Sequence, residues 1–554
     1  MTTTEARTAD AAQRLIGSVL HAGQPGTDVA LATRTPDGWE KTTYRQLEAR
    51  SRALAAALAG WDVQPGDRVA ILAEPGGDWV VAFFAILRAG AVVVPLDTKL
   101  QVAELAAILD HAQAVGCLTS PRLHATATRL PGPAWVRTPA EAPGGASVDA
   151  EGRLDPPRSP HDVAILSYTS GTTGRPKGVE ITFANLSHQV EALTACQDLH
   201  PGDVLLSILP LSHMLELTCG LLGALRAGAT VCHSPALHPH EVGQLIRDGR
   251  VSRMVVVPLF LRLLKKSIEL QVRQAGPVAA RAFALAHALA ARLPARRLRR
   301  LLFGGVHRRL GGRLAVFYCG GAPLDPEVAA FFERMGVRIY QGYGLTETSP
   351  VVAMNSPAHH RPGSVGRPLT GLAVAIAADG EILVRGPSVM RGYFRDPERT
   401  AEAVDADGWL HTGDLGRLDP DGFLYVTGRA KNLIVLDSGK KVQPEEVEEA
   451  LAGSGLVAEV CVLGRRATQG LDAGWEQVCA VVAPSEEACR EHPDPSELER
   501  MIRQDVRERA RVLATYKRPA AVVVHRGELP KTATRKLLRA QIAALLASQE
   551  TRPA

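Results

Sequence analysis

The chain has 554 residues, 46% of them hydrophobic and 22% charged, which predicts a soluble globular protein with at least two cores. A net charge of only +5 excludes a protein that binds nucleic acid over its whole surface. The polar start, with Glu5 and no apolar run behind it, argues against a secretory signal. Residues 204–225, the most apolar long window, contain Pro210, His213 and Glu216 and so predict no transmembrane helix. Eight cysteines without a CxxC pair indicate reduced, buried thiols, and we expect a cytoplasmic protein.

From residue 42 the chain alternates helical and strand patterns. Residues 42–60 read as a strand entering a helix, 68–72 as a buried strand, 79–88 as a helix and 91–95 as another strand. This βαβ rhythm predicts an α/β fold with a largely parallel sheet and helices on both faces. Residues 131–160 are rich in Pro and Gly and are interpreted as a surface connection.

A glycine- and hydroxyl-rich segment, LSYTSGTTGRPKGVE at residues 166–180, follows that connection. Glycines allow backbone N–H groups to converge on an anion, hydroxyls add donors or reach a divalent metal, and Lys177 supplies a charge for phosphate. The segment is not a Walker A loop, because Gly178 rather than Ser or Thr follows Lys177. The candidate phosphate-binding residues are Thr169, Ser170, Gly171, Thr172, Thr173, Gly174 and Lys177, with Thr169 also a candidate metal ligand.

Five further motifs follow: CGGAPL at 319–324, YQGYGLTET at 340–348, GWLHTGD at 408–414, GRAKN at 428–432 and LPKTATRK at 529–536. With the 166–180 segment, they resemble the adenylate-forming (AMP-binding) superfamily, and in particular its AMP-forming long-chain fatty acyl-CoA synthetases. The resemblance covers most of residues 40–540. It implies ATP-dependent activation of a carboxylic acid.

The resemblance implies roles for residues of these motifs. It places adenine along Gly321, Ala322 and Pro323, with Gln341, Gly342 and Tyr343 beside the base. It assigns Thr346 to the α-phosphate, Glu347 to Mg²⁺, Asp414 and Arg429 to the ribose, and Gly439 to the CoA pantetheine channel. Lys536 would bridge carboxylate and phosphate oxygens during adenylation, although Arg535 stands where the family usually has glycine, and Lys531 is the alternative. His213, after Pro210-Leu211, would lie beside the carboxylate pocket.

The resemblance also implies a domain division. It predicts a large N-terminal domain, residues 1–428, of mixed and parallel sheets with flanking helices and a β-barrel-like part. A smaller, mobile α+β domain, residues 429–554, would carry Lys536 and turn about the hinge Lys431.

Two features between these motifs leave alternatives open. Gly220 and Gly223, on the apolar face of a helix expected over residues 215–225, leave space for a chain-shaped ligand or pack against another helix. Residues 262–313 contain thirteen Lys or Arg and one acid, Glu269, a local charge of +12, and include an alanine-rich helix over 277–291. This basic helical insertion either contacts an anionic membrane or is a solvated insertion whose arginines pair with acids.

His238 and His240, at a Pro turn before a helix, are interpreted as a cap region rather than a metal site.

The predicted function is activation of a fatty acid by ATP and Mg²⁺ to acyl-AMP, with release of pyrophosphate and then thioester formation with CoA. The alternative is a fatty acyl-AMP ligase, or a synthetase that delivers the acyl group to an acyl carrier protein. Amino-acid activation is disfavoured, because Met214 rather than an acid follows His213 and no carrier domain follows Ala554. A catalytically dead scaffold is disfavoured by Lys177, Glu347, Asp414, Arg429 and Lys536 occurring together. We expect a cytoplasmic enzyme, with peripheral membrane contact through residues 262–313 as the open question.

Overall fold

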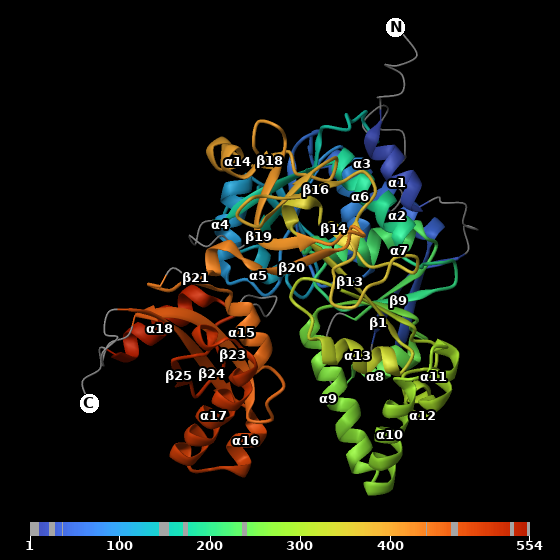
Figure 1. The fold of residues 1–554 in the computed structure, drawn as a ribbon. Coiled ribbons are helices and arrows are strands. Elements are labelled where there is room, and N and C mark those ends of the chain that lie inside the picture. The colour runs from blue at the N-terminus through green and yellow to red at the C-terminus, as the bar shows by residue number, and fades with distance from the viewer. Residues whose placement is uncertain are drawn as a thin grey trace. The chain divides into compact units, whose positions relative to one another are not determined.

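The computed structural model describes residues 10–20, 28–35, 37–142, 154–169, 176–234, 241–438, 440–466, 475–531 and 537–550 (Figure 1). The chain forms two compact units. Residues 1–374, 383–411 and 419–424 make the large unit, and residues 375–382, 412–418 and 425–554 make the small unit. Among the described residues, no helix combines the length and apolar character needed to cross a membrane.

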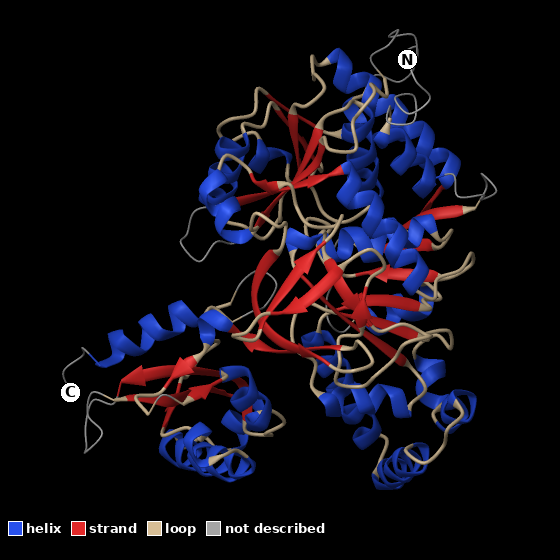
Figure 2. Ribbon diagram, turned by 45° about the horizontal axis from the view of Figure 1, so that its top comes forward, coloured by secondary structure: helices blue, strands red, loops and turns tan. Residues whose placement is uncertain are grey.

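The first part of the large unit is built on a seven-stranded sheet. Its order is β18 (Gly392–Tyr393), β8 (Lys177–Thr182), β7 (Val163–Thr169), β4 (Val92–Pro95), β3 (Arg68–Leu72), β5 (Gly116–Thr119) and β6 (Trp135–Arg137). The strands from β7 to β6 pair in parallel, whereas β8 and β18 are antiparallel additions at one edge. Its helices include α2 (Tyr44–Gly60), α3 (Gly77–Arg88) and α4 (Val102–Ala112). Figure 2 shows helices on both sides of the strands in this unit, as the βαβ rhythm predicts.

A nine-stranded sheet forms the second part of the large unit. Its order is β15 (Arg367–Pro368), β14 (Val351–Met354), β13 (Arg338–Gly344), β12 (Val316–Cys319), β11 (Arg253–Val256), β9 (Val204–Ser207), β10 (Thr230–His233), β1 (Val29–Thr35) and β2 (Gly38–Thr43). Helices α1 (Ala11–Leu20), α6 (Phe183–Cys196), α7 (Gly223–Arg226), α8 (Val242–Asp248) and α13 (Pro326–Arg334) also belong to this unit. Strands β9, β11, β12 and β13 run in parallel, so the segments that follow them emerge at one edge of the sheet.

The helix expected over residues 215–225 is formed, but its first part, Glu216–Leu222, is π-helical and α7 follows it. The two glycines of this segment do not line open space. A Cβ at Gly220 would lie 2.4 Å from Glu216 Oε1, and one at Gly223 would lie 2.7 Å from Gln197 Oε1. Gly223 thus packs against the residue that follows α6, whereas Gly220 accommodates a side chain of its own helix.

The basic insertion consists of four helices between β11 and β12: α9 (Pro258–Gln274), α10 (Pro277–Ala290), α11 (Arg296–Leu302) and α12 (Gly304–Arg309). Arg296 donates to the carbonyls of Gly336 and Ala315, each at 2.8 Å, and Arg300 donates to the carbonyl of Leu314 at 2.7 Å. These two arginines thus hold α11 against neighbouring segments of the large unit. They do so through backbone oxygens rather than through the acids that the sequence suggested as partners.

The small unit contains the three-stranded sheet β23 (Val457–Arg466), β24 (Glu476–Pro484) and β25 (Ala521–Val524), and the pair β21 (Ile434–Val435) and β22 (Lys441–Val442). Its helices are α15 (Pro444–Leu451), α16 (Glu486–Glu491), α17 (Pro495–Arg509) and α18 (Arg539–Glu550). A further sheet has the order β16 (Ala373–Ile376), β17 (Glu381–Arg385), β19 (Leu410–Leu418) and β20 (Leu424–Arg429), and parts of it are assigned to the small unit. The predicted division after residue 428 stays a prediction.

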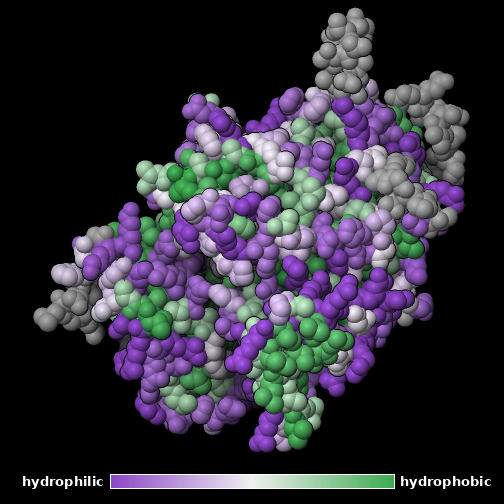
Figure 3. Space-filling view, turned by 45° about the vertical axis from the view of Figure 1, so that its right-hand side comes forward, coloured by the Kyte–Doolittle hydropathy of each residue, from purple (hydrophilic) through white to green (hydrophobic). Residues whose placement is uncertain are grey.

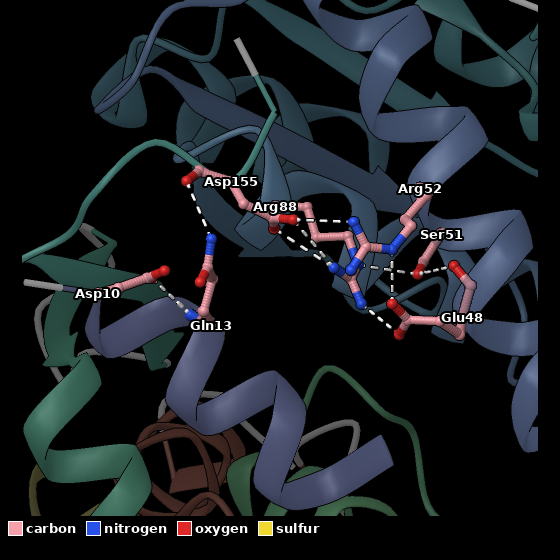
Figure 4. Close-up of polar contacts among 7 residues, drawn as sticks. All are labelled: Asp10, Gln13, Glu48, Ser51, Arg52, Arg88 and Asp155. Carbon is pink, nitrogen blue, oxygen red and sulfur yellow. Dashed lines mark hydrogen bonds and ion pairs between the residues drawn. The ribbon is translucent and has the colours of Figure 1, made fainter. Parts of the chain in front are cut away.

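A buried arginine network ties the Pro-rich connection to the helices of the large unit (Figure 4). Arg88, the last residue of α3, donates to Ser51 at 3.1 Å, pairs with Asp155 at 3.3 Å and bonds the carboxylate of Glu48. Arg52 also pairs with both acids, at 2.7 Å to Glu48 and 3.3 Å to Asp155. The Arg88 side chain is 2% exposed, so its charge depends on these partners.

We expect Arg88→Met to destabilise the large unit by about 3 kcal/mol, because it leaves buried acidic groups without their main counter-ion. Arg50→Met is the matched control. Arg50 pairs with Asp78 at the surface, and such pairs contribute about 0–1 kcal/mol. Calorimetric unfolding of both variants measures the difference, and equal effects would show that the Arg88 network contributes no more than a surface pair.

Candidate active site

The two ends of the glycine-rich loop are held in a hairpin. β7 and β8 pair in antiparallel register, and Thr169 lies opposite Lys177 at the last position of the ladder. Both side chains are half-buried. Ser170, Gly171, Thr172, Thr173 and Gly174 lie outside the described residues. The structure thus fixes where the loop begins and ends, with Lys177 at its exit.

Lys177 and Glu347 are brought together by a residue that the sequence reasoning missed, Tyr393. The Lys177 ammonium lies 4.0 Å from the centroid of the Tyr393 ring, a cation–π distance. The Tyr393 hydroxyl donates to Glu347 Oε1 at 2.9 Å. Burial, and then the Glu347 carboxylate, raise the pKa of Tyr393, which keeps the phenol protonated as a donor. Tyr393 reaches this place because β18 pairs with β8, with Tyr393 opposite Val179.

The segment around Glu347 is held tightly by its own backbone. Thr348 Oγ1 accepts from Leu345 N at 3.0 Å and donates to the carbonyl of Pro350 at 2.7 Å. A Cβ at Gly344 would lie 1.8 Å from that same carbonyl, so only glycine fits there. Thr346 and Glu347 belong to the short 3₁₀ turn that this arrangement forms.

Glu347 is the carboxylate that we predict to hold Mg²⁺. Within the described residues, no group of three or more His, Cys, Asp or Glu side chains is placed to hold a metal ion. The half-buried Glu347 carboxylate, linked to Lys177 through Tyr393, fits the way Mg²⁺ is bound, with one or two carboxylates plus substrate phosphates and water.

The two segments predicted to contact adenine lie next to each other. β12 and β13 are parallel neighbours, with Cys319 opposite Gln341. Gly321, Ala322 and Pro323 follow β12 and are exposed, and the end of β13 carries Gln341, Gly342 and Tyr343. Gly321 has φ = +84°, a conformation that favours glycine and lets the chain turn away at the sheet edge. The structure therefore brings these six residues to one edge of the nine-stranded sheet.

His213 has an acidic partner that the sequence analysis did not single out. Its Nε2 lies 3.3 Å from Oδ2 of Asp97, which follows β4 and also accepts from the Lys99 N–H at 2.9 Å. Burial alone would raise the pKa of Asp97, but the adjacent His213 side chain and the hydrogen bond from the Lys99 N–H outweigh it and lower the pKa. An ionised Asp97 orients the imidazole of His213. The two residues are 116 positions apart, so no local pattern links them.

Glu216, three residues after His213, is fully buried in the π-helical turn. Burial raises the pKa of its carboxyl to about 8, although the nearby Ser207 hydroxyl and Leu209 N–H act to lower it. The carboxyl is therefore mostly protonated at pH 7.

The raised pKa of Glu216 predicts a pH-dependent stability. The folded chain keeps a proton that the unfolded chain releases near the ordinary value of 4.5, so this contribution is complete below pH 4.5 and is lost as the pH rises through about 8. We expect Glu216→Gln to match the wild-type unfolding midpoint at pH 5, to exceed it increasingly up to about pH 8, and to keep that difference above pH 8. Glu402→Gln, at an exposed position, should show no such trend. A constant difference between Glu216→Gln and wild type across this range would contradict the assignment.

In the small unit, Asp414 and Arg429 form an ion pair. Arg429 Nε lies 2.8 Å from Asp414 Oδ1, and the Asp414 side chain is buried while that of Arg429 is exposed. Lys431 lies in the 3₁₀ turn Ala430–Asn432, directly after β20. Gly439 lies outside the described residues.

The loop that carries Lys536 is closed at its base. Lys531 and Leu537 form an antiparallel bridge, and Leu538 N donates to the carbonyl of Pro530 at 2.9 Å. Lys536 itself lies outside the described residues. Lys531, the alternative catalytic lysine, is largely buried and paired with Glu459 and Glu528. These ion pairs favour a structural role for Lys531.

A large α/β unit and a smaller α+β unit are the architecture of the adenylate-forming enzymes, and the family matches and curated relatives show the chain to be an AMP-forming acid–thiol ligase. Residues 20–394 match the model of the AMP-binding enzyme family, and residues 446–536 match that of the AMP-binding enzyme C-terminal domain. The chain belongs to the AMP-binding enzyme family.

Several relatives share most of the chain. The long-chain-fatty-acid–CoA ligase FadD15 of Mycobacterium bovis is 35% identical over 474 residues, 79% of this chain and 78% of its own length. The feruloyl-CoA synthase of an Amycolatopsis species is 32% identical over 527 residues, 92% of this chain and 95% of its own length.

Solved structures share the fold. The ATP-bound MatB of Rhodopseudomonas palustris is 27% identical, with a TM-score of 0.75 over 97% of this chain and 99% of that one. The o-succinylbenzoate CoA synthetase MenE of Bacillus subtilis, in complex with its acyl-adenylate, is also 27% identical, with a TM-score of 0.74 over 95% of this chain and 97% of that one. These likenesses confirm the predicted fold class.

Proposed function

We propose that the chain activates a fatty acid with ATP and Mg²⁺, releases pyrophosphate, and transfers the acyl group from acyl-AMP to CoA. The observation that carries this proposal is the cluster of Lys177, Tyr393 and Glu347. A cation and a carboxylate held by one protonated tyrosine suit a polyphosphate and its metal ion.

Each predicted site residue has a part in this reaction. Lys177 and the loop from Thr169 to Gly174 neutralise the phosphate oxygens, and Glu347 holds Mg²⁺, which disperses the charge that develops on them. Gly321, Tyr343 and their neighbours accept the base, and Asp414 with Arg429 binds the ribose. The Asp97–His213 pair lies beside the carboxylate of the acid. The remaining assignments are Thr346 to the α-phosphate, Lys536 to the reacting oxygens, Lys431 to the hinge and Gly439 to the pantetheine channel.

The carboxylate attacks the α-phosphorus in line, and the bond to pyrophosphate breaks as the new P–O bond forms. The CoA thiolate then attacks the acyl carbonyl and AMP leaves. No covalent bond to the protein is needed, so positioning and electrostatic stabilisation account for the rate.

An amino acid is disfavoured as substrate, and a fatty acid is proposed over an aromatic acid because of the motif resemblance and the fatty-acid–CoA ligase relatives. The relatives include both a long-chain-fatty-acid–CoA ligase and a feruloyl-CoA synthase, so family membership alone leaves the acid open. Met214, which follows His213, is buried among Leu211, Leu217 and other apolar side chains, and an amino group would find no counter-ion at that position.

Pyrophosphate release from ATP and Mg²⁺ tests the proposal, with acids from acetate to stearate and several aromatic acids, each with and without CoA. We expect acyl-CoA, identified by mass spectrometry, with fatty acids of medium or long chain. Release of pyrophosphate and formation of acyl-AMP without any thioester would instead support the carrier-protein alternative, which a phosphopantetheinylated acyl carrier protein then tests. Turnover with aromatic acids alone would overturn the fatty acid assignment.

Contact between residues 262–313 and an anionic membrane is part of the proposal. Fatty acids partition into bilayers, so an enzyme that meets a bilayer surface meets its substrate there.

A further inference from the structure

The helical insertion carries a concentration of exposed hydrophobic side chains. Among the described residues, thirteen large hydrophobic side chains are exposed, and eight of these lie between residues 263 and 302. Figure 3 shows a hydrophobic patch on this part of the molecule, with hydrophilic surface around it. The eight are Leu263, Leu270, Val278, Leu285, Leu289, Leu298, Leu301 and Leu302. Patches of this kind on soluble proteins mark interaction sites.

The exposed leucines follow the helical period. On α9, Leu263 and Leu270 are seven residues apart and therefore share one face. On α10, Val278, Leu285 and Leu289 share a face by the same rule, and Val278 and Leu285 are 78% and 70% exposed. The opposite side of α10 packs inward, where Phe283 lies 5.5 Å from Phe303 between ring centroids. The hydrophobic faces of these helices thus point to solvent, while other hydrophobic residues hold the helices to the large unit.

Basic residues occupy the same outer faces as these hydrophobic residues. Arg273 lies three residues after Leu270 on α9, and Arg281 lies three residues after Val278 on α10. Arg292 lies in the turn directly after α10, and all three arginines are exposed. Long basic side chains can lie along an apolar surface and hold their charge at its edge. Leucine with arginine on one helical face is the pattern of helices that lie in a membrane interface.

We propose that the outer faces of α9, α10 and α11 form a docking surface for an anionic lipid bilayer. The leucines enter the boundary between headgroups and acyl chains, and arginines such as Arg273, Arg281 and Arg292 bind lipid phosphates. Arg296 and Arg300 are not part of this surface, because they bind backbone carbonyls. The surface therefore differs from the arginine run that the sequence pattern highlights.

The positive charge of the insertion favours a bilayer over a second copy of the chain as the binding partner. Residues 262–313 carry thirteen basic residues and the single acid Glu269, so two copies facing each other through this surface would bring two strongly positive surfaces together. An anionic bilayer complements both the hydrophobic and the positive character. The inference rests on the proposed function only for what docking would achieve, which is access to fatty acids. Binding to a bilayer does not itself require catalysis.

Vesicle flotation of the full chain tests the inference, with phosphatidylcholine vesicles and with mixed phosphatidylcholine–phosphatidylglycerol vesicles. We expect the wild type to float with the mixed vesicles. The Leu285→Ser/Leu289→Ser variant should bind these vesicles at least roughly tenfold more weakly than the wild type. Val102→Ser/Val512→Ser, which replaces residues 55% and 82% exposed outside the insertion, is the matched control and should bind like wild type. Arg281→Glu/Arg292→Glu should lose the preference for phosphatidylglycerol.

Three outcomes would overturn the inference. They are no flotation of the wild type, unchanged binding of the leucine variant, and a leucine variant that changes the oligomeric state in size-exclusion chromatography. The last would assign the surface to contact between copies. ATP–pyrophosphate exchange with hexanoate, without vesicles, should be equal in all variants. Failure of the proposed function would appear as no exchange with any acid while flotation persists, so the two failures are distinguishable.

Discussion

Glu347→Gln is expected to lower the rate of ATP–pyrophosphate exchange roughly 10²- to 10³-fold, because it removes the charge that we assign to Mg²⁺ at the phosphates. Glutamine has the same shape, and its carbonyl oxygen can still accept the hydrogen bond of Tyr393, which is 2.9 Å long in the structure. The change therefore tests the carboxylate charge rather than the packing. A titration with Mg²⁺ should show that the variant needs a higher concentration to reach its own maximum rate.

Tyr393→Phe is the matched control for Glu347→Gln. The ring under the Lys177 ammonium is retained and one hydrogen bond to Glu347 is lost, so we expect a reduction of roughly tenfold or less. If Glu347→Gln exchanges pyrophosphate at the wild-type rate and with the wild-type Mg²⁺ dependence, Glu347 is not the metal ligand. A larger loss in Tyr393→Phe than in Glu347→Gln would show that the phenol itself acts on the substrate.

Lys536→Ala is expected to lower ATP–pyrophosphate exchange roughly 10³-fold, because an ammonium that neutralises the reacting oxygens would be lost. Thioester formation from synthetic acyl-AMP and CoA should stay within a few-fold of wild type, since that step does not form the phosphoryl bond. Measuring the two half-reactions separately distinguishes a catalytic lysine from one that supports the fold, because a structural defect would slow both.

Lys531→Ala provides the comparison within the same loop. Lys531 is held by Glu459 and Glu528 at the base of the loop, so its removal should reduce stability by about 1–2 kcal/mol and exchange only a few-fold. The reverse result, with exchange abolished in Lys531→Ala and retained in Lys536→Ala, would reassign the catalytic role to Lys531. It would also show that Arg535, in place of the family's glycine, marks a loop built differently.

The structure adds residues that no local pattern could indicate. Tyr393 comes to Lys177 and Glu347 only because β18 adds to the edge of the seven-stranded sheet beside β8. Asp97 comes to His213 only because the segment after β4 lies near the one after β9. Each pair is more than a hundred residues apart except Tyr393 and Glu347, which are 46 apart, and sequence spacing carries no signal over such distances.

Burial also decided questions that the residue types left open. The sequence left open whether Gly220 lines a ligand channel or packs against a neighbour. In the structure the Glu216 carboxyl occupies the space beside Gly220. The arginines of residues 296–300 could have met lipid or acids, and Arg296 and Arg300 instead bind backbone carbonyls. In both cases the same side chain suits several environments, and only the folded neighbours select one.

The sequence by itself determined the family, the α/β class and the motif residues, because glycine turns, strand ends and the residues placed on them are properties of short continuous segments. Gly344, for example, tolerates no side chain beside the Pro350 carbonyl, and both lie within one motif region. Only the tertiary structure decided which cation, acid and phenol meet, and which leucines of residues 263–302 face solvent. Those outcomes depend on contacts between distant segments and on how each helix is rotated against its sheet, and such contacts form only when the whole unit folds.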